Sequence, residues 1–267
     1  MSPNDGAPDR GTTRGGRARD QARDKVADLV GLGGLWSAAL DPLIETHPDF
    51  VEAYVDLASH PWRAGRLAPK TRHLVGLSLS AAATHLYRPG IRSHCRAAID
   101  AGATADEILE TLMLASTLGV HACVLGVPIL TEKLAAKGDT AASPTRDDAR
   151  RGALKAEFVK RRGYWNPVWD GLLALDPDYF AAFTAFSSMP WRSGALEPKV
   201  KEFIYIATDV SATHQFAPGT HIHVENALGL GASAEEILEV MQLASTLGIE
   251  TFEVALPIVL EELGARA

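Results

Sequence analysis

The pattern of hydrophobic and polar positions predicts helices along most of the chain. Residues 70–83 and 199–212 contain β-branched and small residues, so strands are conceivable there. However, no alternation of period two persists in either stretch, and both are longer than typical strands. Pro69 and Pro198 suit the first turn of a helix, because a first turn leaves its N–H groups unpaired and proline has none. We therefore expect a long helix at each position.

Two further helices are predicted by the residues at their starts. Thr104–Glu107 and Ser233–Glu236 have the Ser/Thr-x-x-Glu pattern of a capping box. In such a box a hydroxyl and a carboxylate satisfy two backbone N–H groups. Amphipathic sequence follows each box. Gly119 and Gly248 fall where these helices should bend or end.

All of these signals occur twice, at one constant offset, which is the offset from Pro61 to Pro190. The segment Leu114-Ala-Ser-Thr-Leu-Gly119 recurs unchanged from Leu243 to Gly248. Every match needs the same shift and no gap, so chance is excluded and the chain is a tandem repeat. We predict an all-α protein with roughly six helices per copy. The expected parts are a disordered tail at 1–23, a first helical unit at 24–137, a polar linker at 138–149 and a second helical unit at 150–267.

Composition narrows the functional classes. The chain has 267 residues, with 46% hydrophobic and 22% charged. These fractions are typical of a soluble globular protein. A formal net charge of −7 argues against nucleic acid as a partner. No apolar run reaches the roughly 18 residues that indicate a membrane span. The only cysteines, Cys95 and Cys123, form no Cys-x-x-Cys pair, so we expect a cytoplasmic protein with reduced thiols.

The long helix and the segment after it resemble a known family. Pro198-Lys-Val-Lys-Glu-Phe-Ile-Tyr-Ile-Ala, followed by His223 and Gly231-Ala-Ser-Ala-Glu-Glu-Ile, is similar to the carboxymuconolactone decarboxylase and alkylhydroperoxidase-D-like superfamily. The first copy has the same frame, and the resemblance covers nearly the whole chain. It implies units that assemble as trimers or hexamers. Three chains of two units each would then form a homotrimer that imitates a hexamer of single units.

The peroxidase branch of this superfamily has a Glu on the long helix, then a Cys-x-x-Cys pair, then a His. In the second copy Glu202 matches the Glu, but His214 and Ala217 stand where the cysteines should be. Thiol peroxidase chemistry needs a low-pKa thiolate and a resolving thiol, so we reject that activity. The decarboxylase branch needs no cysteines and acts on small cyclic carboxylic acids, which leaves it open.

The first copy departs from the same pattern in another way. His73 replaces the Glu, His85 the first cysteine and Arg88 the second, while His94 matches the family His. His85 and His214 each follow a Thr, and a second His lies nine residues after each. The copies therefore keep their frame and differ at the positions expected to line a pocket.

Three interpretations of the histidines remain open. In the first, they perform acid–base catalysis, because imidazole titrates near neutral pH. The candidate catalytic residues are Glu202, His214, His221, His223, His85 and His94. Arg88 or Arg92 could hold a substrate carboxylate, and Tyr87 and Phe216 are candidates for the pocket wall.

In the second interpretation, Glu202, His214 and His223 bind a divalent transition metal such as Zn, Fe or Cu. Helix geometry argues against this set, because Glu202 and His214 are twelve residues apart and twelve residues of continuous helix advance about 18 Å. The two side chains could then meet at one ion only if the helix breaks or another segment folds back. His221 and His223 are two residues apart and should point to roughly opposite sides. In the third interpretation the histidines only cap helices and bond buried carbonyls.

The sequence favours an enzyme that acts on a small cyclic or carboxylated molecule by histidine acid–base chemistry. A metal-dependent oxidoreductase or lyase is one alternative, and a non-catalytic binding or assembly protein is another. The second copy is expected to hold the fuller site, because it keeps Glu202 and adds His221. His121 and Glu250, which are equivalent in the two copies, also differ and could face a pocket.

Overall fold

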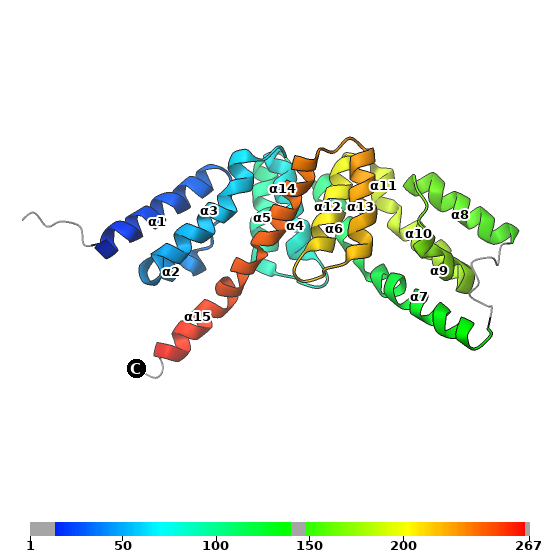
Figure 1. The fold of residues 1–267 in the computed structure, drawn as a ribbon. Helices are drawn as coiled ribbons and strands as arrows, with labels where there is room; N and C mark the ends of the chain where they lie inside the picture. The colour runs from blue at the N-terminus through cyan, green and yellow to red at the C-terminus, as the bar shows by residue number, and fades with distance from the viewer. Residues whose placement is uncertain (1–13, 140–147, 265–267) are drawn as a thin grey trace, which may run out of the picture. The chain divides into compact units, whose positions relative to one another are not determined.

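The computed structural model describes residues 14–139 and 148–264. Within these ranges the chain forms helices and no strand, so the predicted all-α class is confirmed. The two long helices expected from the proline positions are α4 (Pro69–Ala81) and α12 (Pro198–Val210), which Figure 1 labels. Each begins with its proline.

The helices predicted from capping boxes are α6 (Ala105–Ser116) and α14 (Ala234–Ser245). The backbone N–H of Thr104 donates to Glu107 Oε2 at 2.8 Å, and the N–H of Glu107 donates to Thr104 Oγ1 at 3.2 Å. The corresponding Ser233–Glu236 pair has the same two distances. Both boxes therefore satisfy N–H groups that a helix start leaves unpaired.

A short 3₁₀ turn follows each of these helices, at Thr117–Val120 and at Thr246–Ile249. The turns lead into α7 (His121–Ala136) and α15 (Glu250–Gly264). They contain the two glycines at which a bend was expected.

The chain divides into two compact units that do not coincide with the sequence repeats. One unit runs up to Gly65 and resumes at Thr246, and the other is Arg66–Ser245. The first unit contains α15 together with α1 (Arg14–Gly31), α2 (Asp41–Thr46) and α3 (Pro48–Ala64). The second contains α4, α6, α7, α12 and α14 together with α5 (Arg88–Asp100), α8 (Ala149–Arg162), α9 (Asp170–Leu175), α10 (Pro177–Ser187), α11 (Met189–Ser193) and α13 (Ala217–Gly229).

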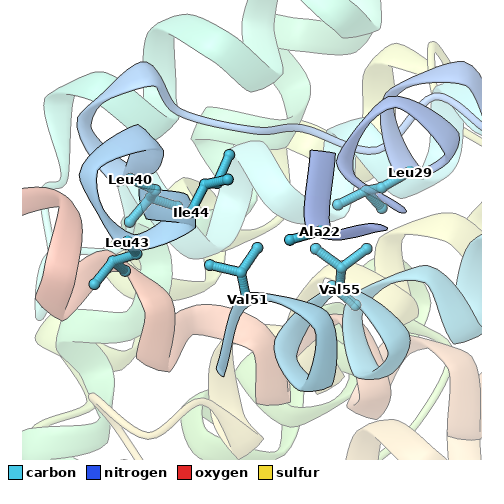
Figure 2. Packing of buried hydrophobic residues seen from close by; sticks show 8 residues of the cluster. Ala22, Leu29, Leu40, Leu43, Ile44, Val51 and Val55 are labelled. Carbon is cyan, nitrogen blue, oxygen red and sulfur yellow. The ribbon is translucent and has the colours of Figure 1, made fainter. Parts of the chain in front are cut away.

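The last helix of each copy packs with the first helices of the other copy. Each compact unit contains one such exchanged helix. In the first unit, Ile249, Phe252 and Leu256 pack against a buried cluster shown in Figure 2, which includes Ala22, Leu29, Leu40, Leu43, Ile44, Val51 and Val55. In the second unit, Val124 of α7 belongs to the buried cluster built around Phe158, Trp169 and Phe180, and Val127 packs against that cluster. This exchange explains why the compact units cut across the repeats.

The expected tail at 1–23 was too long. Helix α1 begins at Arg14, and Ala22 and Leu29 on it are buried. These apolar residues form a narrow stripe among many charged residues, so composition alone hides the helix. Residues 1–13 lie outside the described part of the chain, as do residues 140–147 of the predicted linker.

Two buried carboxylates connect the copies inside the second unit in a reciprocal way. Glu239 on α14 accepts hydrogen bonds from the backbone N–H groups of Arg66 and Leu67, and its Oε1 lies 2.6 Å from Arg72 Nε. Both side chains of this ion pair are buried. The carboxylate thus finds its donors on the other copy.

Glu110 on α6 makes the mirror arrangement with the second copy. It accepts from the backbone N–H groups of Ala195 at 3.3 Å and Leu196 at 3.2 Å, and its Oε1 lies 2.7 Å from Lys201 Nζ. The lysine also donates to the carbonyl of Pro190 at 2.6 Å. We call these two sets of contacts the carboxylate clamps.

Removing either clamp carboxylate should destabilise the protein strongly. Glu110→Ala or Glu239→Ala removes the carboxylate that pairs with a buried cation and the acceptor of two backbone N–H groups, so we expect a loss of about 3–5 kcal/mol in the free energy of unfolding. Urea denaturation followed by circular dichroism measures this. Glu132→Ala, which removes an exposed carboxylate, is the control and should change stability by less than about 1 kcal/mol. A similar small change for the two clamp variants would contradict the assignment.

Candidate active site

The turn between α12 and α13 brings His214 back toward the end of α12. The backbone N–H of Phe216 donates to the carbonyl of Asp209 at 2.7 Å, which closes the turn. Gln215 has a positive φ, a left-handed conformation that costs a non-glycine residue roughly 1 kcal/mol. Helix α12 ends at Val210, so the separation that a continuous helix would impose does not apply here.

Glu202 and His223 form a buried pair between α12 and α13. The Nδ1 atom of His223 lies 2.6 Å from Glu202 Oε2, and Asn226 Nδ2 donates to Glu202 Oε1 at 3.3 Å. Glu202 is 1% exposed and His223 8% exposed. The carboxylate therefore fixes the imidazole through one ring nitrogen and leaves Nε2 as the nitrogen that can exchange a proton with a bound molecule.

Tyr205 sets the position of this imidazole. The rings of Tyr205 and His223 are stacked, with centroids 4.4 Å apart and planes at 24°. In the first copy the residue equivalent to Tyr205 is Gly76, where an added Cβ would clash with the ring of His94. The glycine thus lets His94 occupy space that an aromatic ring fills in the second copy.

A small cavity opens beside the Glu202–His223 pair. Its volume of about 40 Å³ is room for a few water molecules or for part of a small ligand. Its lining is largely apolar and aromatic, with a few polar side chains. The lining includes His121, Arg162, Tyr205, Phe216, Gly219 and His223.

Arg162, the last residue of α8, contributes the cationic side chain of this lining. It is 9% exposed, and its Nη1 donates to the carbonyl of Ser187 at 3.2 Å. Its guanidinium carbon lies between 5.1 and 6.0 Å from the ring centres of Trp191, Tyr205, Tyr164 and Phe158. A buried cation among aromatic faces is well placed to pair with an anionic ligand.

His121, the first residue of α7, enters the same site from the first copy. Its ring stacks on Phe216 with centroids 3.8 Å apart, and its Nδ1 lies 2.6 Å from Nε2 of His214. On the other side, His121 Nε2 lies 3.9 Å from Asp209 Oδ1. Burial, and then the neighbouring His214, lowers the pKa of His121 to about 3, so its imidazole is neutral near pH 7.

Asp209 is a buried carboxyl group at the end of α12. It is 1% exposed, and its Oδ2 has no hydrogen-bond partner among the described residues. Oδ2 lies against Gly219, where an added Cβ would clash with it, so a glycine is required for this approach. Burial, reinforced by the charge of Glu202, raises the pKa of Asp209 to about 8, because both effects disfavour the charged form.

The corresponding pair in the first copy consists of two histidines. His73 Nδ1 lies 3.5 Å from His94 Nδ1. Burial, and then Arg72, lowers the pKa of His73 to about 4, while burial, and then His73, lowers the pKa of His94 to about 3. Both imidazoles are therefore neutral near pH 7, and no carboxylate takes the place that Glu202 has.

Comparison with known proteins identifies the family. The Carboxymuconolactone decarboxylase family matches residues 48–130 and 177–261, which is well over half of the chain and covers both copies. The chain belongs to the carboxymuconolactone decarboxylase family. None of the curated proteins matches it.

A solved structure gives the same fold in tandem form. The chain is similar to the crystal structure of a "putative gamma-carboxymuconolactone decarboxylase subunit" from Burkholderia xenovorans LB400, with 44% sequence identity and a TM-score of 0.86. The match covers 93% of this chain and 98% of that chain. The tandem all-α arrangement and the family resemblance seen in the sequence are thus confirmed.

The structure separates the predicted site residues of this family member into two groups. Glu202, His214, His223 and Phe216 lie at the site described above. His221 is exposed on α13, on the side away from the buried His223, as their spacing indicated. The metal ligands expected from the sequence, Glu202, His214 and His223, do not lie together. His214 lies close to His121 and Asp209, whereas His223 pairs with Glu202.

The predicted residues of the first copy lie elsewhere in the second unit. Arg88 and Arg92 are exposed on α5, and His85 is half-buried, 5.6 Å from the buried ring of Tyr87. None of these four lines the cavity. Their catalytic or substrate-binding roles stay predictions.

Three residues of the site were missed in the sequence: Tyr205, Arg162 and Asp209. A signal for them existed, because the equivalent positions of the first copy hold Gly76, Gly33 and Ser80. Divergence between otherwise similar copies marks pocket positions, and it had already drawn attention to His121. Comparing the copies along their whole length would have found the other three.

The neutral histidines of the first copy should make the protein less stable in acid. Their pKa values of about 4 and about 3 lie below the value of about 6.5 for an unfolded chain, so the unfolded state binds protons first. The free energy of unfolding should therefore fall as the pH drops from about 6.5 toward about 4. Urea titrations from neutral to mildly acidic pH measure this slope.

A variant identifies the source of the effect. In His94→Gln the unfolding free energy should depend less steeply on pH. The difference in bound protons between the unfolded and folded states should fall by up to one, because that imidazole is no longer present. His60→Gln, at an exposed position, should keep the slope of the unchanged protein. Equal slopes in all three proteins would show that the histidine pair does not cause the acid sensitivity.

Proposed function

We propose that this member of the family is a decarboxylase-type lyase that acts on a small carboxylated organic molecule, such as a carboxylated lactone. The observation that carries the proposal is the buried Glu202–His223 pair beside one cavity with Arg162. The family, and the name of the similar Burkholderia xenovorans protein, support the same reaction class. The pair supplies proton transfer, and the guanidinium supplies a place for an acid group.

Arg162 would bind a carboxylate of the substrate. A guanidinium presents parallel N–H groups that match two carboxylate oxygens, and burial strengthens the attraction. The surrounding aromatic rings exclude water and fit a flat or cyclic molecule. Arg162 and Glu202 carry opposite charges. The guanidinium therefore offsets the repulsion that the Glu202 carboxylate alone would exert on an anionic substrate.

His223 would supply the proton that decarboxylation requires. When the bond between the substrate carbon and its carboxylate breaks, CO₂ leaves and the electron pair stays on the carbon, delocalised into an adjacent carbonyl. Protonated His223 donates a proton from Nε2 to that carbon and later regains one from water, so one proton is consumed for each CO₂ released. Glu202 stabilises the imidazolium through Nδ1 and holds the ring in place.

The first copy lacks the parts that this reaction uses. At the positions of Glu202, Arg162 and Tyr205 it has His73, Gly33 and Gly76. Because its histidine pair is neutral near pH 7, it lacks a protonated acid there. We therefore propose one catalytic site per chain, in the second copy. The first copy then provides His121 and the clamp contacts.

Variants of the pair test this function with gamma-carboxymuconolactone as substrate and CO₂ release as readout. Glu202→Gln keeps the shape but removes the charge that stabilises the imidazolium, so kcat should fall about 10²- to 10³-fold, and His223→Gln should cost at least as much. Arg162→Lys should mainly raise KM, about tenfold or more, since a lysine cannot make a bidentate contact.

His94→Gln is the matched control, because it changes the equivalent histidine of the first copy and should leave kcat unchanged. If Glu202→Gln and His223→Gln turn over as fast as the unchanged protein, the proposed acid–base pair is wrong. If the unchanged protein releases no CO₂ from this lactone or from a panel of other carboxylated lactones, the non-catalytic binding function is favoured instead.

We also propose that the chain assembles as a homotrimer. Large apolar side chains are exposed on α7 and α15, and a second copy of the chain would cover them: Leu125, Ile129, Leu130, Val254, Ile258, Val259, Leu260 and Leu263. Such exposed apolar side chains mark a surface that contacts another protein or a membrane. Residues 105–136 and 234–264 are also long and apolar enough to cross a membrane, but length and composition alone do not distinguish such helices from those of a soluble protein.

Light scattering coupled to size-exclusion chromatography, in buffer without detergent, distinguishes a surface that contacts other copies of the chain from one that contacts a membrane. We expect a particle of about three times the chain mass of 28.5 kDa. Ile129→Glu and Ile258→Glu should shift it toward the monomer, because a charge cannot be buried at an apolar interface. A protein that stays in solution only with detergent would favour a membrane surface as the partner.

A further inference from the structure

Three ligand-type side chains converge next to the proposed catalytic pair. They are His121 at the start of α7, Asp209 in the last turn of α12 and His214 in the turn before α13. One nitrogen or oxygen of each lies within 4.8 Å of one from both others. Three segments, from both copies, therefore meet at one point.

The ligand-type atoms of these groups face one another at short range. Two imidazole nitrogens, one of His121 and one of His214, face each other at 2.6 Å. Such a contact forms either when one nitrogen donates an N–H to the other or when both nitrogens point their lone pairs at one cation. Facing them is a carboxyl group that is 1% exposed, with one oxygen unpartnered among the described residues. A buried carboxylate without donors is costly unless a cation or a proton compensates it.

We propose that His121, Asp209 and His214 bind one divalent first-row transition metal ion, with two imidazole nitrogens and one carboxylate oxygen as ligands. Two histidines and one carboxylate are the ligand types that iron(II) and zinc sites use when positions are left open for water or substrate. His121 and the neighbouring Phe216 and Gly219 line the cavity. The open positions of the ion would therefore face the cavity that Arg162 and His223 also line.

The ligands need only small movements to reach an ion. Zinc–nitrogen and zinc–oxygen bonds of about 2.0–2.2 Å place neighbouring ligand atoms roughly 3 Å apart. His214 faces His121 Nδ1 at 2.6 Å, whereas Asp209 Oδ1 lies 3.9 Å from His121 Nε2. The side chains of Asp209 and His214 would therefore rotate until both approach the same nitrogen of His121. Stacking on Phe216 holds the ring of His121 in place.

This set is specific to one copy. The positions equivalent to Asp209, His214 and His121 hold Ser80, His85 and Glu250 in the repeat. A serine hydroxyl is a poor ligand for these ions, so we expect one ion per chain. The inference does not rest on the proposed decarboxylase function, because metal binding is measured directly and the catalytic pair and Arg162 are not among the ligands.

Titration with Co²⁺ tests the site. Protein without an affinity tag is treated with chelator, dialysed and titrated near neutral pH, while the visible absorption of Co²⁺ reports its ligands. We expect one equivalent to bind with an absorption band of low-coordinate cobalt, and Zn²⁺ to displace it. Asp209→Asn and His214→Gln should each weaken binding at least about 100-fold, and elemental analysis of protein expressed with metals present should show about one metal per chain.

His85→Gln is the matched control, since it changes the equivalent histidine of the first copy and should leave Co²⁺ binding unchanged. Circular dichroism checks that each variant keeps its helices, and His214→Gln, at a half-buried position, serves if Asp209→Asn does not fold. Less than a tenth of an equivalent of bound Co²⁺, or binding that neither ligand variant weakens, would overturn the inference. Either of these results, together with loss of CO₂ release in Glu202→Gln and His223→Gln, would overturn the metal site and leave the decarboxylase function standing.

Discussion

The second unit depends on two buried carboxylates that each satisfy groups of the other copy. Glu110 and Glu239 accept backbone N–H groups just before α12 and α4 and pair with Lys201 and Arg72. A buried carboxylate is tolerated only when its lone pairs and charge are fully matched. The match requires both copies at once, because one clamp joins α6 to the start of α12 and the other joins α14 to the start of α4. Helix α12 carries the carboxylates and the tyrosine of the site.

The exchange of last helices has a consequence for chemistry. Because α7 packs on the first helices of the second copy, His121 lies beside His214 and the other site residues, which are far away in sequence. A single copy could not build this site. The scaffold positions of the two copies can stay alike while the pocket positions change, because function resides in the site and not in the fold. The histidine pair of the first copy shows how far they have changed.

Much of the fold followed from local rules. Proline at a first turn, a capping box and a glycine near a helix end are short-range signals, and they placed α4, α12, α6 and α14 with their ends nearly correct. The start of α1 was missed because its stripe of Ala22 and Leu29 is too narrow to register in composition. The site was predicted less completely. Glu202, His214 and His223 were named from family positions, but their grouping into a pair and a separate cluster was not visible.

The sequence by itself determined the helical class, the duplication and the lack of a Cys-x-x-Cys pair for thiol redox chemistry, because each rests on residue types and spacing along the chain. The tertiary structure alone decided which side chains meet. Whether His214 faces His223 or His121 depends on a turn at Gln215 and on a helix contributed by the other copy. Such contacts arise from packing between distant segments, and no local pattern carries that information.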